Sequence, residues 1–172
     1  MKPGLSSFLP KFDVCIKEAQ KYAIFVRGRE LQESAISHLD SLIAEIEVLR
    51  QASIAASDED NANGFLALEL MARGLRKEIL FYVKLKDDDA GGAWDCLVAC
   101  ERYMRNAMRA HRVADQLSNY IARIETLQEL LFPKQRFFSS GCRVELSTCS
   151  ICGSPYDECE HIIGRPYMGQ IC

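Results

Sequence analysis

Proline and glycine are scarce over most of this 172-residue sequence, and none of its five prolines falls within residues 11–132. Proline breaks helices and glycine weakens them, so their scarcity over so long a stretch favours helix. Long apolar runs are also missing, which argues against a membrane span. The first ten residues lack the apolar segment of a secretion signal. We therefore expect a cytosolic (cytoplasmic) protein that has no membrane partner.

A strong excess of charge of either sign is lacking as well. The net charge is −3, with 26% charged and 48% hydrophobic residues, and the pI is about 5.7. This composition is typical of a globular protein and excludes a wholly disordered chain. A nucleic-acid-binding domain is usually basic. The charge balance therefore predicts a protein partner and disfavours nucleic acid.

Apolar spacing predicts four helical stretches. They cover about 11–27, 29–56, 60–86 and 93–132. The largely acidic segment 57–60, Ser-Asp-Glu-Asp, is suited to capping the third stretch and to the positive end of its dipole. Residues 86–92, with three aspartates and two glycines, form the clearest turn. The sequence therefore predicts an all-α fold, an up-and-down helical bundle of about four helices over residues 5–132.

The fourth stretch has the most regular apolar pattern. Its members recur at steps of mostly three and four, which indicates one continuous stripe along a single helix. They are Trp94, Leu97, Met104, Met108, His111, Ala114, Leu117, Ile121, Ile124, Leu127 and Leu131. The stripe is expected either to form intramolecular core or to bind a partner protein or a second copy of the chain.

Five of the eight cysteines lie after residue 133, where the helical composition ends. Cys149 and Cys152 form a C-x2-C pair followed by Gly153, the spacing of a zinc knuckle. Cys159 and His161 follow, and residues two apart on an extended segment point the same way. Three thiolates and one imidazole are a suitable set for one tetrahedral zinc ion.

A second ligand set is possible, in which Cys172 replaces Cys159. The first set closes smaller loops and is preferred. Four protein ligands leave no position for an activated water, so the zinc is expected to be structural. The chain then divides into a bundle at 5–132, a linker at 133–148 and a zinc-binding module at 149–172. The cysteines of the helical stretches are expected to be small core residues: Cys15, Cys96 and Cys100.

The end of the sequence resembles that of uncharacterised bacterial proteins, some of which are connected with phage or mobile elements. The similarity is carried by Cys-Ser-Ile-Cys-Gly from Cys149, by Glu-Cys-Glu-His-Ile around Cys159, and by Gly-Arg-Pro-Tyr-Met-Gly-Gln-Ile-Cys ending at Cys172. It covers about the last 25 residues well. The resemblance implies a zinc-binding bacterial module and no particular activity.

Two nuclease patterns provide alternatives. Glu160-His161-Ile162 after the knuckle resembles half of an HNH nuclease site, but no helix with an asparagine and a second histidine follows it. Arg105-Asn106-x4-His111 fits the R-x4–6-H pattern of HEPN ribonucleases, whose helical bundles dimerise to form the active site. Six residues of ideal helix would place Arg105 and His111 roughly 120° apart, which weakens that match.

No complete catalytic constellation can be assembled from the sequence. We therefore expect a non-catalytic, zinc-containing interaction protein, an adaptor or regulatory subunit of a bacterial cytosolic assembly such as an antiviral defence system. Its protein partner would bind the helical bundle or the zinc tail. The alternative is a HEPN-like ribonuclease that uses Arg105 and His111.

Overall fold

The computed structural model describes residues 4–14, 17 and 29–133, and every regular element in these ranges is a helix. The elements are listed in chain order with their bounds: η1 (Leu5–Ser7), α2 (Arg29–Ala55), α3 (Glu59–Lys86), α4 (Ala90–Ala110), η2 (Arg112–Leu117) and α5 (Ser118–Leu131). The all-α prediction is therefore confirmed for the described part of the chain. The predicted linker and zinc module lie outside it.

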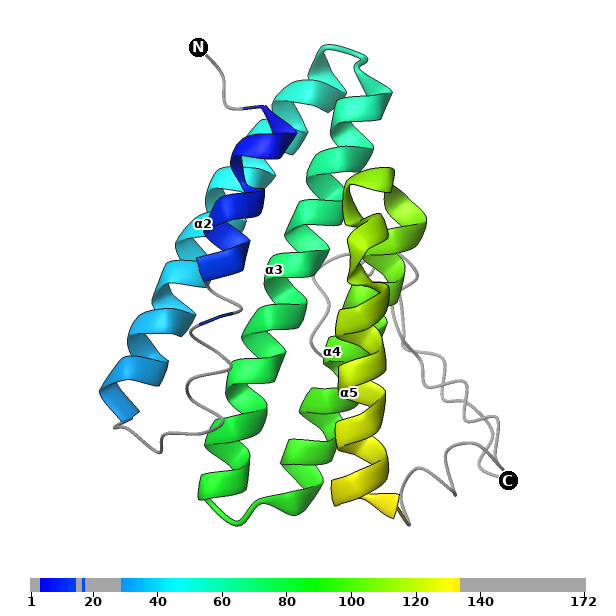
Figure 1. Ribbon diagram of the computed structural model, residues 1–172. Coiled ribbons are helices and arrows are strands. Elements are labelled where there is room, and N and C mark those ends of the chain that lie inside the picture. The colour runs from blue at the N-terminus through cyan, green and yellow to red at the C-terminus, as the bar shows by residue number, and fades with distance from the viewer. Residues whose placement is uncertain (1–3, 15–16, 18–28, 134–172) are drawn as a thin grey trace, which may run out of the picture.

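The long helices run alternately up and down, with α3 between α2 on one side and the α4–α5 pair on the other (Figure 1). Residues 9–14 are helical and lie beside α2. The Phe8 ring meets the edge of Phe65 in α3 at a centroid distance of 6.2 Å. Lys11 pairs with Glu45 of α2 across 3.5 Å. The start of the described chain is thus packed against both α2 and α3.

Two turns, α2–α3 and α3–α4, use the same device. Each has a residue with positive φ, Ser57 (56°) or Asp88 (55°), followed at once by an aspartate. The residue at positive φ ends the preceding helix, and the aspartate caps the next one. Asp58 accepts the backbone N–H of Asn61, and Asp89 accepts that of Gly92. The capping role expected for residues 57–60 is confirmed.

Gly92 lies close to the carboxylate of the second cap. A Cβ atom at this position would lie 2.3 Å from Asp89 Oδ2. A side chain would therefore displace the carboxylate that begins α4. This close approach explains why glycine follows the aspartates here. The predicted turn at 86–92 is shorter than expected, because α4 already begins at Ala90 and includes both glycines.

Replacing Asp89 with alanine is expected to lower the melting temperature by about 2–4 °C at neutral pH. The N–H of Gly92 and the ammonium of Lys84, 3.0 Å away, hold the pKa of Asp89 below its ordinary value. A carboxyl whose folded pKa is depressed stabilises the fold above its unfolded pKa of about 4 and loses that contribution as the pH falls.

Thermal unfolding at pH 7 and pH 3 measures this prediction. The difference in melting temperature between the parent and Asp89→Ala should be smaller at pH 3 than at pH 7. Asp88→Asn is the matched control, because it removes a carboxylate from the same turn and keeps a residue that tolerates positive φ. An equal difference at both pH values would contradict the role of the Asp89 charge.

The prediction of a single helix over residues 93–132 is wrong. α4 ends at Ala110, and His111 is fully extended with φ −163° and ψ 148°. The six-residue η2 follows, and α5 then runs back along α4 (Figure 1). The Trp94 ring near the start of α4 therefore meets the Phe132 ring at the end of α5, with centroids 5.8 Å apart.

The apolar stripe of this stretch is divided between two helices that face the same core. Leu97, Met104 and Ile124 are among the largest fully buried side chains of the described residues. Most of the stripe therefore forms intramolecular core, and it does not provide the continuous partner face that we considered. Its two end members, the half-buried Trp94 and the exposed Leu131, reach the surface. The other fully buried large side chains come from the N-terminal segment and from α2 and α3: Phe8, Phe12, Leu39, Ile46, Leu68, Leu70, Leu75, Ile79 and Phe81.

The second and third predicted helices, at 29–56 and 60–86, match α2 and α3 within one residue at each end. Of the first, predicted over 11–27, residues 11–14 and 17 are helical, and the others lie outside the described residues. Among the described helices, none combines the length and hydropathy needed to cross a membrane.

Candidate functional site

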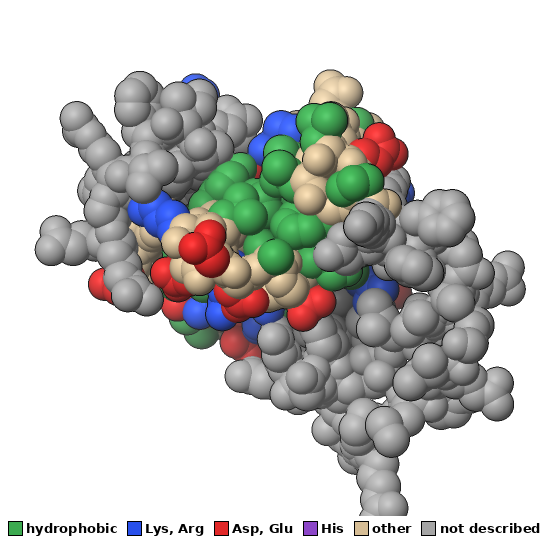
Figure 2. Space-filling model, turned by 90° about the horizontal axis from the view of Figure 1, so that it is seen from below, with side chains coloured by type: hydrophobic (Ala, Val, Ile, Leu, Met, Phe, Trp, Pro, Cys, Tyr) green, Lys and Arg blue, Asp and Glu red, His purple; other side chains and the backbone are tan. Residues whose placement is uncertain are grey.

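The lower end of the bundle carries an exposed group of apolar side chains, which Figure 2 shows from below. We define the apolar end as the partly exposed Leu85, Trp94 and Leu131 together with the buried Phe132 that contacts Trp94. These residues lie where α3 ends, α4 begins and α5 ends. Leu85 is 38% exposed and Leu131 is 48% exposed. Trp94 is half-buried on Phe132. Contiguous exposed apolar surface of this kind is typical of protein interaction sites.

Charged residues lie beside the apolar end. Asp87, Asp88 and Asp89 form the α3–α4 turn, and Figure 2 shows both acidic and basic side chains next to the apolar area. Lys84 pairs with Asp89. Glu129 lies in the last turn of α5, which contains no basic residue. In these described segments, carboxylates therefore outnumber lysines.

A buried glutamate links three helices in the middle of the bundle. Glu78 of α3 is fully buried and accepts the Tyr82 hydroxyl on Oε1 at 3.1 Å. The Tyr120 hydroxyl of α5 donates to Oε2. The Arg123 guanidinium, also from α5, lies 2.6 Å from Oε1 and 4.7 Å from the centre of the Tyr120 ring. Cys100 of α4 completes the group, with its Sγ 3.5 Å from the Tyr120 hydroxyl.

The electrostatics of this cluster keep its donors protonated. Burial, and then the nearby Glu78 carboxylate, raises the pKa of Tyr82 and of the Cys100 thiol. Burial, Cys100 and Glu78 raise the pKa of Tyr120 in the same way. Burial lowers the pKa of Arg123, but Glu78 outweighs this effect and the net pKa is raised. Arg123 therefore stays charged opposite Glu78, and the thiol is a poor nucleophile at neutral pH.

Sequence reasoning missed this cluster. The available signal was a glutamate at position 78, next to Ile79 and one turn before Tyr82, on the apolar face of α3. A charge on a core-facing stripe requires a partner. The partners Tyr120 and Arg123 lie more than 40 residues away, so only the folded chain identifies them. The cluster fixes α5 against α3 and α4.

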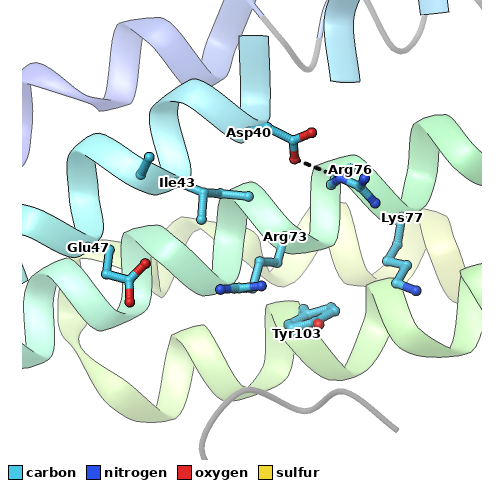
Figure 3. Close-up of a pocket in the computed structure, with 8 residues that line it drawn as sticks. Asp40, Ile43, Glu47, Arg73, Arg76, Lys77 and Tyr103 are labelled. Carbon is cyan, nitrogen blue, oxygen red and sulfur yellow. Dashed lines mark hydrogen bonds and ion pairs between the residues drawn. The ribbon is translucent and has the colours of Figure 1, made fainter. Parts of the chain in front are cut away.

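A groove of about 340 Å³ lies between α2 and α3 (Figure 3). Arg76 Nε donates to Asp40 Oδ1 across it at 2.8 Å. Arg73 pairs with the buried Glu69, with Nη2 3.0 Å from Oε1. Both arginines of the groove are thus already paired, Arg76 with α2 and Arg73 within α3. Its lining comprises Asp40, Ile43, Ala44, Glu47, Arg73, Arg76, Lys77 and Tyr103.

The structure gives Arg105 and His111 separate partners. Arg105 of α4 pairs with Glu101, at 2.9 Å, and with Glu125 of α5. His111 Nδ1 accepts the backbone N–H of Val113 at 3.0 Å and so caps η2. Its Nε2 lies 3.3 Å from Asp60 Oδ1, at the start of α3. Among the described residues, these contacts hold the fold together, and none joins Arg105 to His111. The ribonuclease alternative stays a prediction.

The predicted zinc ligands Cys149, Cys152, Cys159 and His161 lie outside the described residues, as does the substitute Cys172. Within residues 4–14, 17 and 29–133, no group of three or more His, Cys, Asp or Glu side chains is placed to hold a metal ion. Cys96 and Cys100 are buried, as predicted for core residues.

No protein-family model matches this chain, and no curated protein or solved structure is significantly similar to it. Its function is therefore inferred from its own residues. The fold and the candidate site define an all-α protein with a salt-bridged, hydrogen-bonded interior and one apolar end.

Proposed function

We propose that this chain is a non-catalytic interaction or adaptor protein of a bacterial cytosolic assembly, such as an antiviral defence system. The observation that supports the proposal is the apolar end, where α3 ends, α4 begins and α5 ends with the half-buried Trp94 and two exposed leucines, Leu85 and Leu131. Partly exposed tryptophans with surrounding apolar side chains are frequent centres of binding energy in protein interfaces. The interaction surface thus belongs to the end of the bundle.

Structural zinc is part of the proposal. Cys149, Cys152, Cys159 and His161 would hold one zinc ion, with Cys172 as the substitute ligand for Cys159. The metal would stabilise the C-terminal segment, which contains too few apolar residues for a core of its own. It would supply no activated water, since all four positions are taken by the protein.

Replacing Leu85 and Leu131 together with glutamine is expected to abolish partner binding and leave the fold intact. Both side chains are already partly in water, so the polar substitutions should change stability little. The full-length protein is purified under mild conditions from the organism that naturally produces it. The proteins that co-purify with it are then quantified. One retained protein should fall by at least about tenfold in Leu85→Gln/Leu131→Gln.

The matched control is Val48→Gln/Ile54→Gln, which removes two exposed apolar side chains from α2, 69% and 53% exposed. Retention in this control should equal that of the parent. Equal retention in all three proteins would contradict a role for the apolar end. An RNA-cleavage activity that His111→Ala abolishes would instead establish the ribonuclease alternative and overturn the adaptor proposal.

A further inference from the structure

Arginines are concentrated in the second half of α4 and in η2. Arg102, Arg105 and Arg109 belong to α4, and Arg112 follows in η2. At 100° per residue, the three arginines of α4 fall within an arc of about 60°, on the side of the helix away from its buried residues. Arg105 and Arg109 are exposed, and Arg102 is half-buried. We define these three residues as the arginine face.

Two residues of the arginine face differ from the other arginines in their ion pairs. Elsewhere, every arginine whose side chain the structure describes has a carboxylate within 4.0 Å. Arg50 and Arg73 pair with Glu69, Arg76 with Asp40, Arg105 with Glu101 and Glu125, and Arg123 with Glu78. The exceptions are Arg102, Arg109 and Arg112, for which no carboxylate of the described residues lies within this distance. Arg109 donates only to the Asn106 amide oxygen, at 3.3 Å.

The environment of Arg102 favours an additional carboxylate. Burial lowers the pKa of Arg102, and the nearby Glu101 offsets only part of this effect. Glu101 itself accepts from Arg105 and from the Gln128 amide. A guanidinium that is partly removed from water without a close carboxylate is unfavourable, so a carboxylate supplied from outside would stabilise it.

We propose that the arginine face binds an acidic helical segment of another protein. Guanidinium groups pair with carboxylates through two parallel hydrogen bonds. Arg102, Arg105 and Arg109 follow one another at steps of three and four residues, which correspond to about 4.5 and 6 Å along the helix axis. A partner helix with glutamate or aspartate at the same steps presents its carboxylates at the same intervals.

A protein segment fits this surface better than a nucleic acid. Proteins that bind single-stranded nucleic acid combine cations with exposed aromatic rings on which bases stack. The aromatic residues of α4 are Trp94, at the opposite end of the helix, and Tyr103, which is buried; η2 has none. The net charge of −3 also opposes the approach of a polyanion.

The arginine face is separate from the apolar end. Trp94 and Arg109 both belong to α4, and the 15 residues between their positions correspond to about 22 Å along the helix axis. The inference therefore adds a second surface and does not rest on the first. An adaptor with both surfaces would join two partners.

The test uses the full-length protein and fluorescent peptides of about 14 residues, or four helical turns. One peptide carries glutamates at alternating steps of three and four, and a second carries lysines at these positions. At low salt, the glutamate peptide should bind at least about tenfold more tightly than the lysine peptide. The difference should narrow at 1 M salt, where the Debye length is about 3 Å.

Two variants identify the groups responsible. Arg102→Gln/Arg109→Gln should lower the affinity for the glutamate peptide about tenfold and change the melting temperature little, because neither residue has a carboxylate partner to lose. Arg102→Glu/Arg109→Glu should reverse the preference, so that the lysine peptide binds more tightly. The matched control is Lys17→Gln/Lys86→Gln, which removes two exposed positive charges outside the arginine face and should leave the affinity unchanged.

Several results would overturn the inference. They include equal affinity for the glutamate and lysine peptides at low salt, and an affinity that Arg102→Gln/Arg109→Gln leaves unchanged. A peptide with the same glutamates scattered around the helix should bind less tightly, and equal binding would contradict the matched spacing. Leu85→Gln/Leu131→Gln should not affect the glutamate peptide, so failure of this inference is distinguishable from failure of the proposed function.

Other occupants have their own signatures, each of which would also overturn the inference. A single-stranded RNA of about the same length that binds more tightly than the glutamate peptide would establish nucleic acid as the ligand. A higher affinity in Asp157→Asn/Glu158→Gln would show that this chain's own acidic residues compete for the arginine face. A concentration-dependent dimer that Arg102→Gln/Arg109→Gln abolishes would identify a second copy as the occupant.

Discussion

Replacing Glu78 with alanine is expected to lower the free energy of unfolding by about 3–5 kcal/mol, the cost of removing one partner from a buried ion pair. Arg123 would lose the carboxylate that lies 2.6 Å from its guanidinium, and Tyr82 and Tyr120 would lose their hydrogen-bond acceptor. Urea unfolding followed by circular dichroism measures the change.

Further variants separate the charge from the hydrogen bonds. Tyr120→Phe removes one donor and should cost about 1–2 kcal/mol. Glu78→Leu combined with Arg123→Met removes both charges and should recover part of the loss seen in Glu78→Leu alone, because no charge is then left without a partner. The double-mutant cycle gives the coupling between the two residues. A loss below about 1 kcal/mol in Glu78→Ala would contradict the role of the cluster in fixing α5.

Protein purified without added metal is expected to contain about one zinc ion per chain, and Cys152→Ser is expected to lose it. Three thiolates cannot be replaced by two without a large loss of affinity, since structural zinc sites in small domains are worth about 10–16 kcal/mol in apparent binding free energy. Elemental analysis measures the zinc. The urea midpoint of the helical signal should stay near that of the parent, because the bundle has its own core.

The two ligand sets give different results in the same measurement. Cys159→Ser should lose zinc if the preferred set is correct, and Cys172→Ser should then keep it. The reverse result would establish Cys172 as the fourth ligand. Cys96→Ala is the control, because it removes a thiol from the bundle. Less than about 0.1 zinc per chain in the parent would contradict the metal prediction.

Much of the fold could be predicted from local signals. The helical spacing in α2 and α3 gave their bounds within one residue, because the turns between helices are marked by aspartates whose capping is local. The break at His111 could not be predicted in this way. The apolar period continues through it, because α4 and α5 turn their apolar faces to the same core. No proline or glycine marks the reversal.

Of the candidate sites too, some could be predicted from the sequence and others could not. The zinc ligands lie close together in the sequence, so their spacing could predict a site. The site stays a prediction, because the ligands lie outside the described residues. The apolar end was not predicted, because Leu85 and Leu131 lie 46 residues apart on different helices. They reach the same end of the bundle because α5 folds back along α4. Arg105 and His111 fit a sequence pattern, yet the reversal gives them separate partners on α5 and α3.

The sequence by itself determined that the described part of the chain is helical, where α2 and α3 begin and end, and which aspartates cap α3 and α4. These features depend on interactions within one or two helical turns. Only the tertiary structure decided that residues 93–132 form a hairpin, that Glu78 is neutralised by Arg123 and that one end of the bundle is apolar. Each of these depends on contacts between residues 20 or more positions apart, whose free energy no local pattern contains.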